Sequence, residues 1–168
     1  MMILATELQQ LKFGELMQVY EEGNRENGQA LYPKCEPNVQ LLQAEQDFYA
    51  YLRDGFFNRP GDLYCIWEAQ GHYVCALRLQ RYQDGLLLEA LETHPEHRGR
   101  GFAKALIREA LKLAETDKVY SHISRRNPAS IAVHMESGFR KILDYSLYAD
   151  GTTNSCCDTY LYEKPRCD

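Results

Sequence analysis

A glycine-rich stretch between a strand-like run and a helix-like run is the most chemically suggestive part of this sequence. The stretch HPEHRGRGFAKAL begins at His94 and places Gly99 and Gly101 one residue apart, beside basic side chains. Such a turn at the start of a helix offers free backbone N–H groups and the positive end of the helix dipole to an anion. Glycines let the backbone approach that anion closely because they carry no Cβ. The stretch predicts a phosphate-binding loop, although a tight strand-to-helix turn alone would use the same glycines.

Neither of the two common nucleotide-binding patterns fits this stretch. A P-loop requires the string G-x-x-x-x-G-K-[ST], which the sequence does not contain. The dinucleotide pattern requires glycine or alanine at position 104, which is occupied by Lys104. We therefore do not expect a nucleotide-dependent enzyme of either kind.

The pattern that remains is Arg98-x-x-Gly101-x-Ala103, directly after a strand-like run. It resembles the acetyl-coenzyme A-binding motif [QR]-x-x-G-x-[GA] of the GNAT N-acetyltransferases. The wider stretch LETHPEHRGRGFAKALI is also similar to the strand, turn and helix of that family, usually written L-x-V-x-P-x-x-R-G-x-G. Thr93 stands where the family usually has valine, an exchange between β-branched residues of similar size.

A second stretch further along the chain strengthens this resemblance. NPASIAVHMESGF, from Asn127 to Phe139, is similar to the later family motif N-x-x-A/S-x-x-x-Y/H-x-x-x-G-F. It follows the next strand-like run, which is its position in the family. The order of elements after residue 60 also agrees, whereas residues 1–60 fit only the variable helical segment of the family.

The resemblance implies that acetyl-coenzyme A is the co-substrate and that the protein needs no metal ion. The pantetheine arm would lie between the strand before the glycine loop and the following parallel strand, against Leu91, Glu92 and Thr93. The pyrophosphate would lie on the loop, whose residues are Arg98, Gly99, Arg100, Gly101, Phe102, Ala103 and Lys104. Asn127 matches an asparagine that contacts the cofactor arm in the family, and it is also suited to cap a helix.

The implied reaction is direct attack of a primary amine on the thioester of acetyl-coenzyme A. A lysine-like amine has a pKa of about 10.4 and arrives protonated, so a general base must take a proton from it. His122 and Glu89 are the candidates for this base, ahead of Glu92. The alternative for Glu89 is the solvent face of an alternating strand, and the alternative for His122 is a half-buried strand histidine.

The departing thiolate needs a proton or a stabilising donor. Many family members use a tyrosine seven residues after the asparagine, and here that position is His134. A histidine can donate a proton, but its lower pKa makes it a different acid from tyrosine. His134 is equally suited to pack in the core, and a C-terminal tyrosine could reach the sulfur instead. The tyrosines considered, which we otherwise expect to pack along the last two strands, are Tyr145, Tyr148, Tyr160 and Tyr162.

The elements that must position these residues follow from the spacing of apolar side chains. The spacing predicts helices over 13–23, from a cap at Asn38 to the breaker at 58–61, over 100–115, and from Asn127 to Gly138. It predicts strands over 62–70, 72–82, 85–94 and 118–124, and a closing hairpin over 139–148 and 156–164. Short turns join the first three strands, whereas a crossover helix makes 118–124 parallel to its neighbour. The fold class is α+β, with a mixed, mostly antiparallel central sheet of six to seven strands flanked by about four helices.

Length, composition and charge narrow the remaining possibilities. The 168 residues are expected to form one GNAT-like domain, with a variable helical, acceptor-side segment at 1–60 and the cofactor-binding sheet and helices at 62–168. A net charge of −5 argues against a nucleic-acid partner. No run reaches the roughly 18 apolar residues that span a membrane, and the N-terminus does not resemble a signal peptide, so we expect a cytoplasmic protein.

Six cysteines are expected to be free thiols, with Cys65 and Cys75 packed in apolar strands; the others are Cys35, Cys156, Cys157 and Cys167. No cysteine or histidine spacing suits zinc. The sequence therefore predicts an N-acetyltransferase for a small-molecule or peptide amine, and a non-catalytic acyl-coenzyme A-binding module is the alternative. The aromatic residues that could wall an acceptor pocket, or form core, are Phe48, Tyr49, Tyr51, Phe56 and Phe57. The oligomeric state stays open, a homodimer included.

Overall fold

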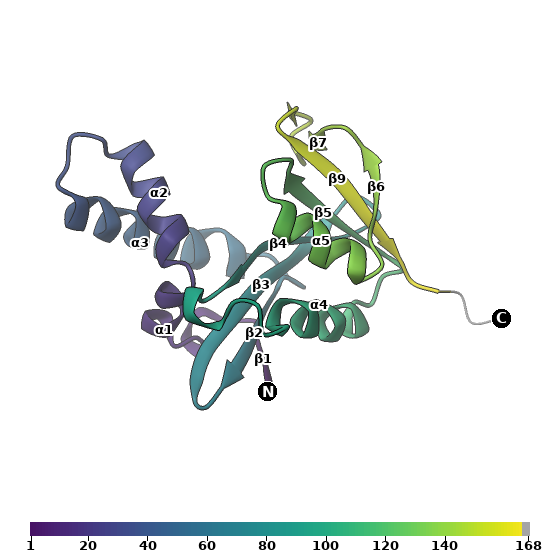
Figure 1. The fold of residues 1–168 in the computed structure, drawn as a ribbon, viewed down its shortest axis with the longest axis horizontal. Coiled ribbons are helices and arrows are strands. Elements are labelled where there is room, and N and C mark those ends of the chain that lie inside the picture. Colours follow the sequence, from purple (N-terminus) through teal and green to yellow (C-terminus); the bar gives the residue numbers. More distant parts are fainter. Residues whose placement is uncertain (166–168) are drawn as a thin grey trace.

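The computed structural model describes residues 1–165, so the thiol expected at Cys167 lies outside the described residues. Its centre is a seven-stranded sheet in the order β1-β2-β3-β4-β5-β9-β6 (Figure 1). The strands are β1 (Met2–Ala5), β2 (Leu63–Ala69), β3 (His72–Tyr82), β4 (Gly85–Thr93), β5 (Lys118–Ser124), β6 (Arg140–Leu143) and β9 (Cys157–Glu163). Neighbouring strands are antiparallel except β4 and β5, which are parallel. The predicted α+β class with a mixed, mostly antiparallel sheet is confirmed.

Five α-helices accompany the sheet: α1 (Phe13–Val19), α2 (Glu21–Leu31), α3 (Pro37–Asp54), α4 (Phe102–Leu113) and α5 (Pro128–Glu136). Short 3-10 turns occur at η1 (Leu8–Gln10), η2 (Phe56–Asn58) and η3 (Pro95–His97). Helices α2 and α3 form a hairpin that extends away from the sheet, whereas α4 lies along it (Figure 1). A small second sheet, formed by β7 (Ser146–Leu147) and β8 (Thr153–Asn154), lies near the end of β9.

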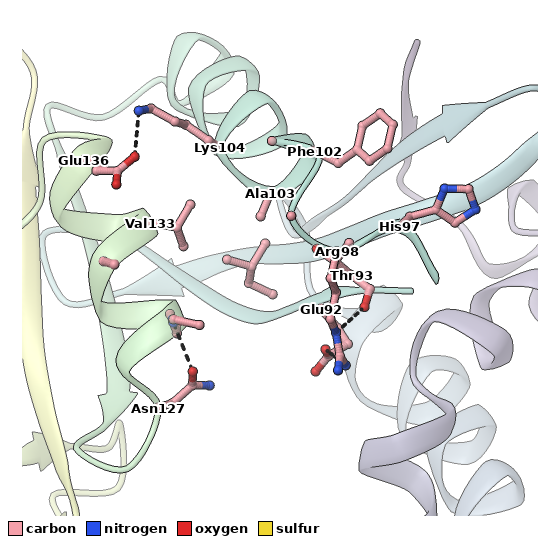
Figure 2. A pocket seen from close by; sticks show the side chains of 16 residues that line it. Glu92, Thr93, His97, Arg98, Phe102, Ala103, Lys104, Asn127, Val133 and Glu136 are labelled. Carbon is pink, nitrogen blue, oxygen red and sulfur yellow. Dashed lines mark hydrogen bonds and ion pairs between the residues drawn. The ribbon is translucent and has the colours of Figure 1, made fainter. Parts of the chain in front are cut away.

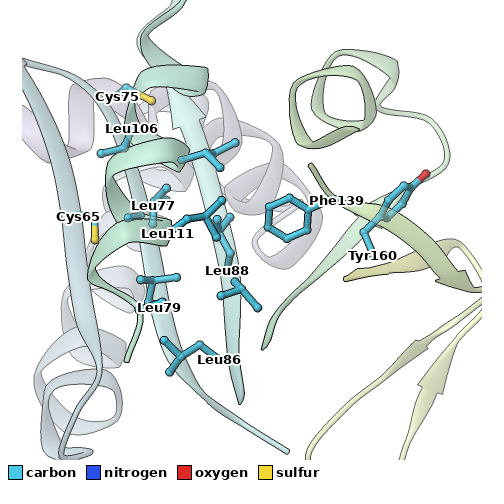
Figure 3. Close-up of a cluster of buried hydrophobic side chains, with 14 of the residues drawn as sticks. Cys65, Cys75, Leu77, Leu79, Leu86, Leu88, Leu106, Leu111, Phe139 and Tyr160 are labelled. Carbon is cyan, nitrogen blue, oxygen red and sulfur yellow. The ribbon is translucent and has the colours of Figure 1, made fainter. Parts of the chain in front are cut away.

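Two hydrophobic cores lie on opposite faces of the sheet because side chains alternate along each strand. On one face, Leu106 and Ile107 of α4 pack against Leu77, Leu79 and Leu88 (Figure 3). On the other face, Tyr64, Ile66 and Ala76 of the sheet pack against α1, α3 and η2, whose buried side chains include Leu16, Leu52 and Phe56. The expected packing of Cys65 and Cys75 is confirmed, since both are fully buried in the α4 core.

Several predicted elements differ from the structure in the N-terminal third. The helix predicted over 13–23 ends at Val19, and a second helix begins at Glu21. Helix α2 was missed because it carries few apolar side chains and two glycines. The cap predicted at Asn38 is wrong, since Glu36 precedes the helix and Pro37 is its first residue. Strand β1 was also missed because four residues are too few for an alternating pattern to be recognised.

Strand β4 carries the irregularity that opens the sheet. Its pairing with β3 shifts by one residue, because Arg78 lies opposite Glu89 while Ala76 lies opposite Glu92. Within this bulge Ala90 has a φ of +51°, a left-handed conformation that is uncommon for a residue other than glycine. The parallel pairing of β4 with β5 ends at Leu88 and Ser121. Beyond that pair the two strands diverge, and two cavities border the divergence from different sides.

Candidate active site

The first cavity, about 710 Å³ in volume, lies between α4 and α5 beside the diverging part of β4. It is lined by every predicted cofactor-binding residue except Arg100: Leu91, Glu92, Thr93, Arg98, Gly99, Gly101, Phe102, Ala103, Lys104 and Asn127. Figure 2 shows that Lys104 and Asn127 approach the cavity from different helices. The sequence reasoning missed the α5 side of the lining, formed by Ala129, Ser130, Ala132, Val133 and Glu136, and it also missed His97. The helical spacing of 129, 132, 133 and 136 was a readable signal for that face.

The glycine loop joins η3 to α4, and both of its glycines have a left-handed backbone conformation. Gly99 and Gly101 have φ values of +74° and +80°. A Cβ at either position would meet nothing within 4 Å, so conformation and not crowding requires glycine there. Gly101 caps α4, and its carbonyl accepts the N–H of Ala105 at 3.0 Å. The N–H groups of residues 102–104 therefore precede the first intrahelical bond and are free for an anion, as at other helix N-termini.

The cations beside this loop are already partnered by carboxylates. Arg98 bonds Glu22 at 2.6 Å and Glu92 at 3.1 Å, and Lys104 bonds Glu136 at 2.7 Å across the cavity (Figure 2). The Lys104 ammonium lowers the pKa of Glu136, while burial raises the pKa of Glu92 against the opposing effect of Arg98. Ion pairs of this kind contribute only about 0–1 kcal/mol each, so a ligand phosphate can replace any of the three carboxylates.

Asn127 has two compatible roles at the start of α5. Its Oδ1 accepts the backbone N–H of Ser130 at 3.0 Å, which confirms the predicted helix cap. The same side chain lines the first cavity, so capping the helix does not remove it from contact with a ligand (Figure 2).

The second cavity, about 670 Å³, lies on the opposite face of the sheet. It is lined by Glu89 and His122, because Leu87 and Glu89 alternate with Leu86 and Leu88, which point into the α4 core. Its other residues are Tyr51, Arg59, Gln80, Arg81, Tyr82, Tyr148, Ala149, Asp150, Thr152 and Cys157. The structure therefore places both base candidates, Glu89 and His122, outside the first cavity and on the other side of the β4–β5 divergence.

The aromatic residues divide between this cavity and the core. Tyr51 lines the second cavity, whereas Phe56 is fully buried beneath it. Tyr148 also lines the second cavity and is 41% exposed, so the expectation that it packs along the last strands was wrong. Tyr160, in contrast, is buried on β9. Tyr148 differs because the chain leaves the seven-stranded sheet after β6 and forms the small β7–β8 sheet before it returns along β9.

His122 combines burial with an unused ring nitrogen. Its Nε2 is buried and has no hydrogen-bond partner among the described residues. The rings of Tyr82 and Tyr148 lie edge-on to it, with centroids 5.4 and 5.6 Å away. Burial lowers the pKa of His122, so the imidazole is neutral at neutral pH and its lone pair can accept a proton.

Glu89 is restrained by an ion pair. Its carboxylate lies 3.2 Å from the Arg78 guanidinium, which is itself largely buried and lies 4.8 Å from the ring centre of Tyr51. The negative charge of Glu89 is therefore compensated within the protein.

His134 lines neither cavity and is 1% exposed. Its Nδ1 lies 2.8 Å from the carbonyl oxygen of Ser130, an acceptor, so Nδ1 carries the proton. Its Nε2 then accepts from the hydroxyl of Ser121 at 3.2 Å. Burial also lowers the pKa of His134, which keeps the ring neutral. Both ring nitrogens are occupied within the protein, so this geometry favours the packing role of His134 over the acid role.

The described residues contain neither a metal-type cluster nor a spanning helix. Among residues 1–165, no group of three His, Cys, Asp or Glu side chains is arranged to hold a metal ion. No helix in that part of the chain has the length and apolar composition needed to cross a membrane. The described cysteines, Cys35, Cys65, Cys75, Cys156 and Cys157, form no disulfide.

The fold and the sequence are similar to those of known acetyltransferases. The spermidine N(1)-acetyltransferase of Vibrio cholerae serotype O1 is 25% identical over 142 residues, which cover 79% of this chain and 77% of that protein. The crystal structure of the PaiA N-acetyltransferase from Thermoplasma acidophilum in complex with coenzyme A superposes with a TM-score of 0.64 at 15% identity, covering 97% of this chain and 99% of the other. The spermidine N-acetyltransferase of Vibrio cholerae in complex with coenzyme A and spermine gives a TM-score of 0.60 at 21% identity, covering 97% and 95%.

At these identities the two solved structures show a shared fold. The family is shown by a family model, described as the acetyltransferase (GNAT) family, that matches residues 19–139. This match spans more than half of the chain and includes the glycine loop and the whole Asn127–Phe139 motif. The chain therefore belongs to the GNAT family of acetyltransferases and is an acyltransferase that uses acetyl-coenzyme A.

Proposed function

We propose that the protein transfers the acetyl group of acetyl-coenzyme A to a primary amine by direct attack of the amine on the thioester. The observation that carries this proposal is the position of the two cavities, which border one divergence of β4 and β5 from opposite faces of the sheet. The first cavity would take the cofactor and the second would take the amine. The thioester supplies an activated acyl carbon and a thiolate leaving group.

Two groups of residues in the first cavity would bind the pyrophosphate and the pantetheine arm of the cofactor. The free N–H groups at the start of α4, with Arg98 and Lys104 beside them, suit the pyrophosphate. Glu92 and Thr93 pair with β3 on one edge, but the backbone of Leu91, Glu92 and Thr93 has left the β4–β5 ladder on the other, so its polar groups on the β5 side are available to the amides of a pantetheine arm. Asn127 would contact the same arm from α5.

His122 is our first choice for the general base. It lines the amine side of the divergence, and its neutral ring offers the unpartnered Nε2 to the ammonium of an incoming amine. Glu89 is the second choice because Arg78 compensates its charge. For the proton that the thiolate needs, Tyr148 is the better placed candidate, since it lines the second cavity beside His122 while His134 lines neither.

We assign the two parts of the chain to the two substrates. Residues 62–165 would form the cofactor side, and residues 1–60 would contribute to the acceptor side. Tyr51 and Arg59, which line the second cavity, support this division. The relatives that act on spermidine support a small-molecule amine as acceptor.

The alternative is a module that binds acyl-coenzyme A without turnover. The test is release of free thiol from acetyl-coenzyme A in the presence of a panel of amines, alongside binding of acetyl-coenzyme A measured by calorimetry. Thiol release that depends on an amine supports the transferase. Tight binding with no release for any amine would support the module instead.

A further inference from the structure

We infer that the amine acceptor also carries an anionic group, a carboxylate or a phosphate, and that Arg59 and Arg81 bind it. This inference rests on the proposed function because it takes the second cavity as the acceptor site. Both arginines line that cavity, on the side away from α5 and the cofactor residues. The fold shared with other acetyltransferases does not define the chemical class of the acceptor.

Neither guanidinium forms an ion pair with a described residue. Arg59 Nη1 lies 3.4 Å from the side-chain oxygen of Gln80, and Arg81 Nε donates to the carbonyl of Pro60 at 3.3 Å. A guanidinium has five N–H donors in a fixed fork, so most donors of both side chains remain free. Arg78 differs from these two arginines because its guanidinium forms an ion pair with Glu89.

Arg81 is held in place by its surroundings. Its backbone N–H donates to Oδ1 of the buried Asp62 at 3.1 Å, and its side chain lies over Gly61. A Cβ at Gly61 would lie 3.1 Å from the Arg81 Nε, so glycine leaves the room that the guanidinium occupies. Gly61 also has a φ of +90°, which favours glycine independently. An arginine fixed in this way loses less conformational entropy when it binds an anion.

Three carboxylates lie in or near the cavity, and among the described residues only one of them is ion-paired. Glu89 pairs with Arg78, and Asp150 accepts from the backbone and hydroxyl of Thr152 at 2.9 and 2.6 Å. The third is Asp62, which is 3% exposed, has an unpartnered Oδ2 and lies behind the backbone of Arg81. A polycation such as spermine would therefore meet two uncompensated arginines and one exposed carboxylate, that of Asp150, in this cavity. An amine with an anionic group meets complementary charge.

The spacing of the residues sets the length of the acceptor. Arg78 lies opposite Glu89 in the β3–β4 ladder, and Arg81 follows about 10 Å further along β3 at about 3.3 Å per residue. An amine beside His122 and Glu89 would thus be several bonds from an anion beside the arginines. An ω-amino carboxylate or a short acidic peptide meets this condition better than an α-amino acid.

The test compares amines of equal length with and without the negative charge. Acceptors are 6-aminohexanoate against hexylamine, O-phosphoethanolamine and glycine as shorter anionic amines, and spermidine as the polycation. Turnover is followed by thiol release, and binding to the protein with coenzyme A bound is followed by calorimetry. The variants are Arg59→Gln and Arg81→Gln. Arg140→Gln is the control, because Arg140 of strand β6 pairs with Glu163 of strand β9, and neither residue lines either cavity.

We expect 6-aminohexanoate to bind at least about tenfold more tightly than hexylamine. Each arginine variant should weaken the binding of 6-aminohexanoate about tenfold, which is the usual effect of losing one charged hydrogen bond. Hexylamine should be unaffected by the same variants, and Arg140→Gln should change nothing. Tighter binding of spermidine than of the anionic amines, or equal losses for charged and neutral amines, would overturn the inference. Binding preference without any turnover would support the inference while contradicting the proposed function.

Discussion

The hydroxyl of Tyr20 donates a 2.6 Å hydrogen bond to the backbone oxygen of Ala90, the residue with positive φ in the β4 bulge. Tyr20 joins α1 to α2, so this bond connects the N-terminal helices to the strand that borders both cavities. Burial raises the pKa of Tyr20 well above its ordinary value, and the hydroxyl therefore remains a donor throughout the working pH range. The bond satisfies a carbonyl that the bulge removes from the regular ladder.

Replacing Tyr20 by phenylalanine should weaken the bulge without emptying the core. We expect a loss of about 1–2 kcal/mol in the free energy of unfolding, because a buried carbonyl loses its donor. The KM for acetyl-coenzyme A should rise, since Leu91 follows the bulge directly. Urea unfolding and steady-state kinetics measure both effects. The control is Tyr49→Phe, at a position that is 40% exposed. Equal changes in the free energy of unfolding and in the KM for the two variants would contradict this role of Tyr20.

Gly101→Glu should abolish detectable binding of acetyl-coenzyme A by placing a carboxylate beside the free N–H groups of α4. The substitution also forces a left-handed residue, at about 1–2 kcal/mol. Gly71→Glu is a matched control, because Gly71 has a φ of +82°, an equally open position and no place in the first cavity. Calorimetric titration should show lost binding only for the Gly101 variant. Similar affinities in the two variants would contradict the cofactor assignment.

His122→Gln should lower kcat at saturating substrates by about 10²–10⁴-fold, the usual contribution of a positioned general base. Burial lowers the pKa of His122, so the wild-type rate should decline only as pH falls below about 6.5, when the ring takes a proton. That decline should be absent from the variant. Glu89→Gln is the comparison, and a retained acidic decline in His122→Gln would transfer the base role to Glu89.

His134→Ala should act mainly on stability. It removes a buried ring and leaves the Ser121 hydroxyl and the Ser130 carbonyl without a partner, at a cost of about 1–3 kcal/mol per group. Because burial lowers the pKa of His134, the unfolded chain binds the proton more readily, and wild-type stability should fall as pH drops below about 6.5. Thermal unfolding between pH 5 and about 8 measures this. A large loss of kcat in a variant that remains folded would return the acid role to His134.

The sequence by itself determined the elements with strong periodicity, and it predicted most of the residues that line one side of the first cavity. Strand β3 and helix α4 were predicted because their apolar side chains repeat with the period of a strand or a helix over many residues. The glycine loop was predicted because its backbone conformation depends on residues adjacent in the chain. Gly99 and Gly101 can adopt positive φ without steric cost because they have no side chain.

The tertiary structure alone decided how the second cavity is built. Glu89 and His122 lie on different strands, and only the end of the β4–β5 pairing places them on one side of a shared divergence. The bulge at Ala90, the pairing of Glu89 with Arg78, and the freedom of Arg59 and Arg81 all depend on residues distant in sequence. His134 shows the same limit, since its role depends on whether its ring nitrogens find partners, and Ser121 reaches it from another element. Local patterns carry no information about such contacts because these form only when the chain packs.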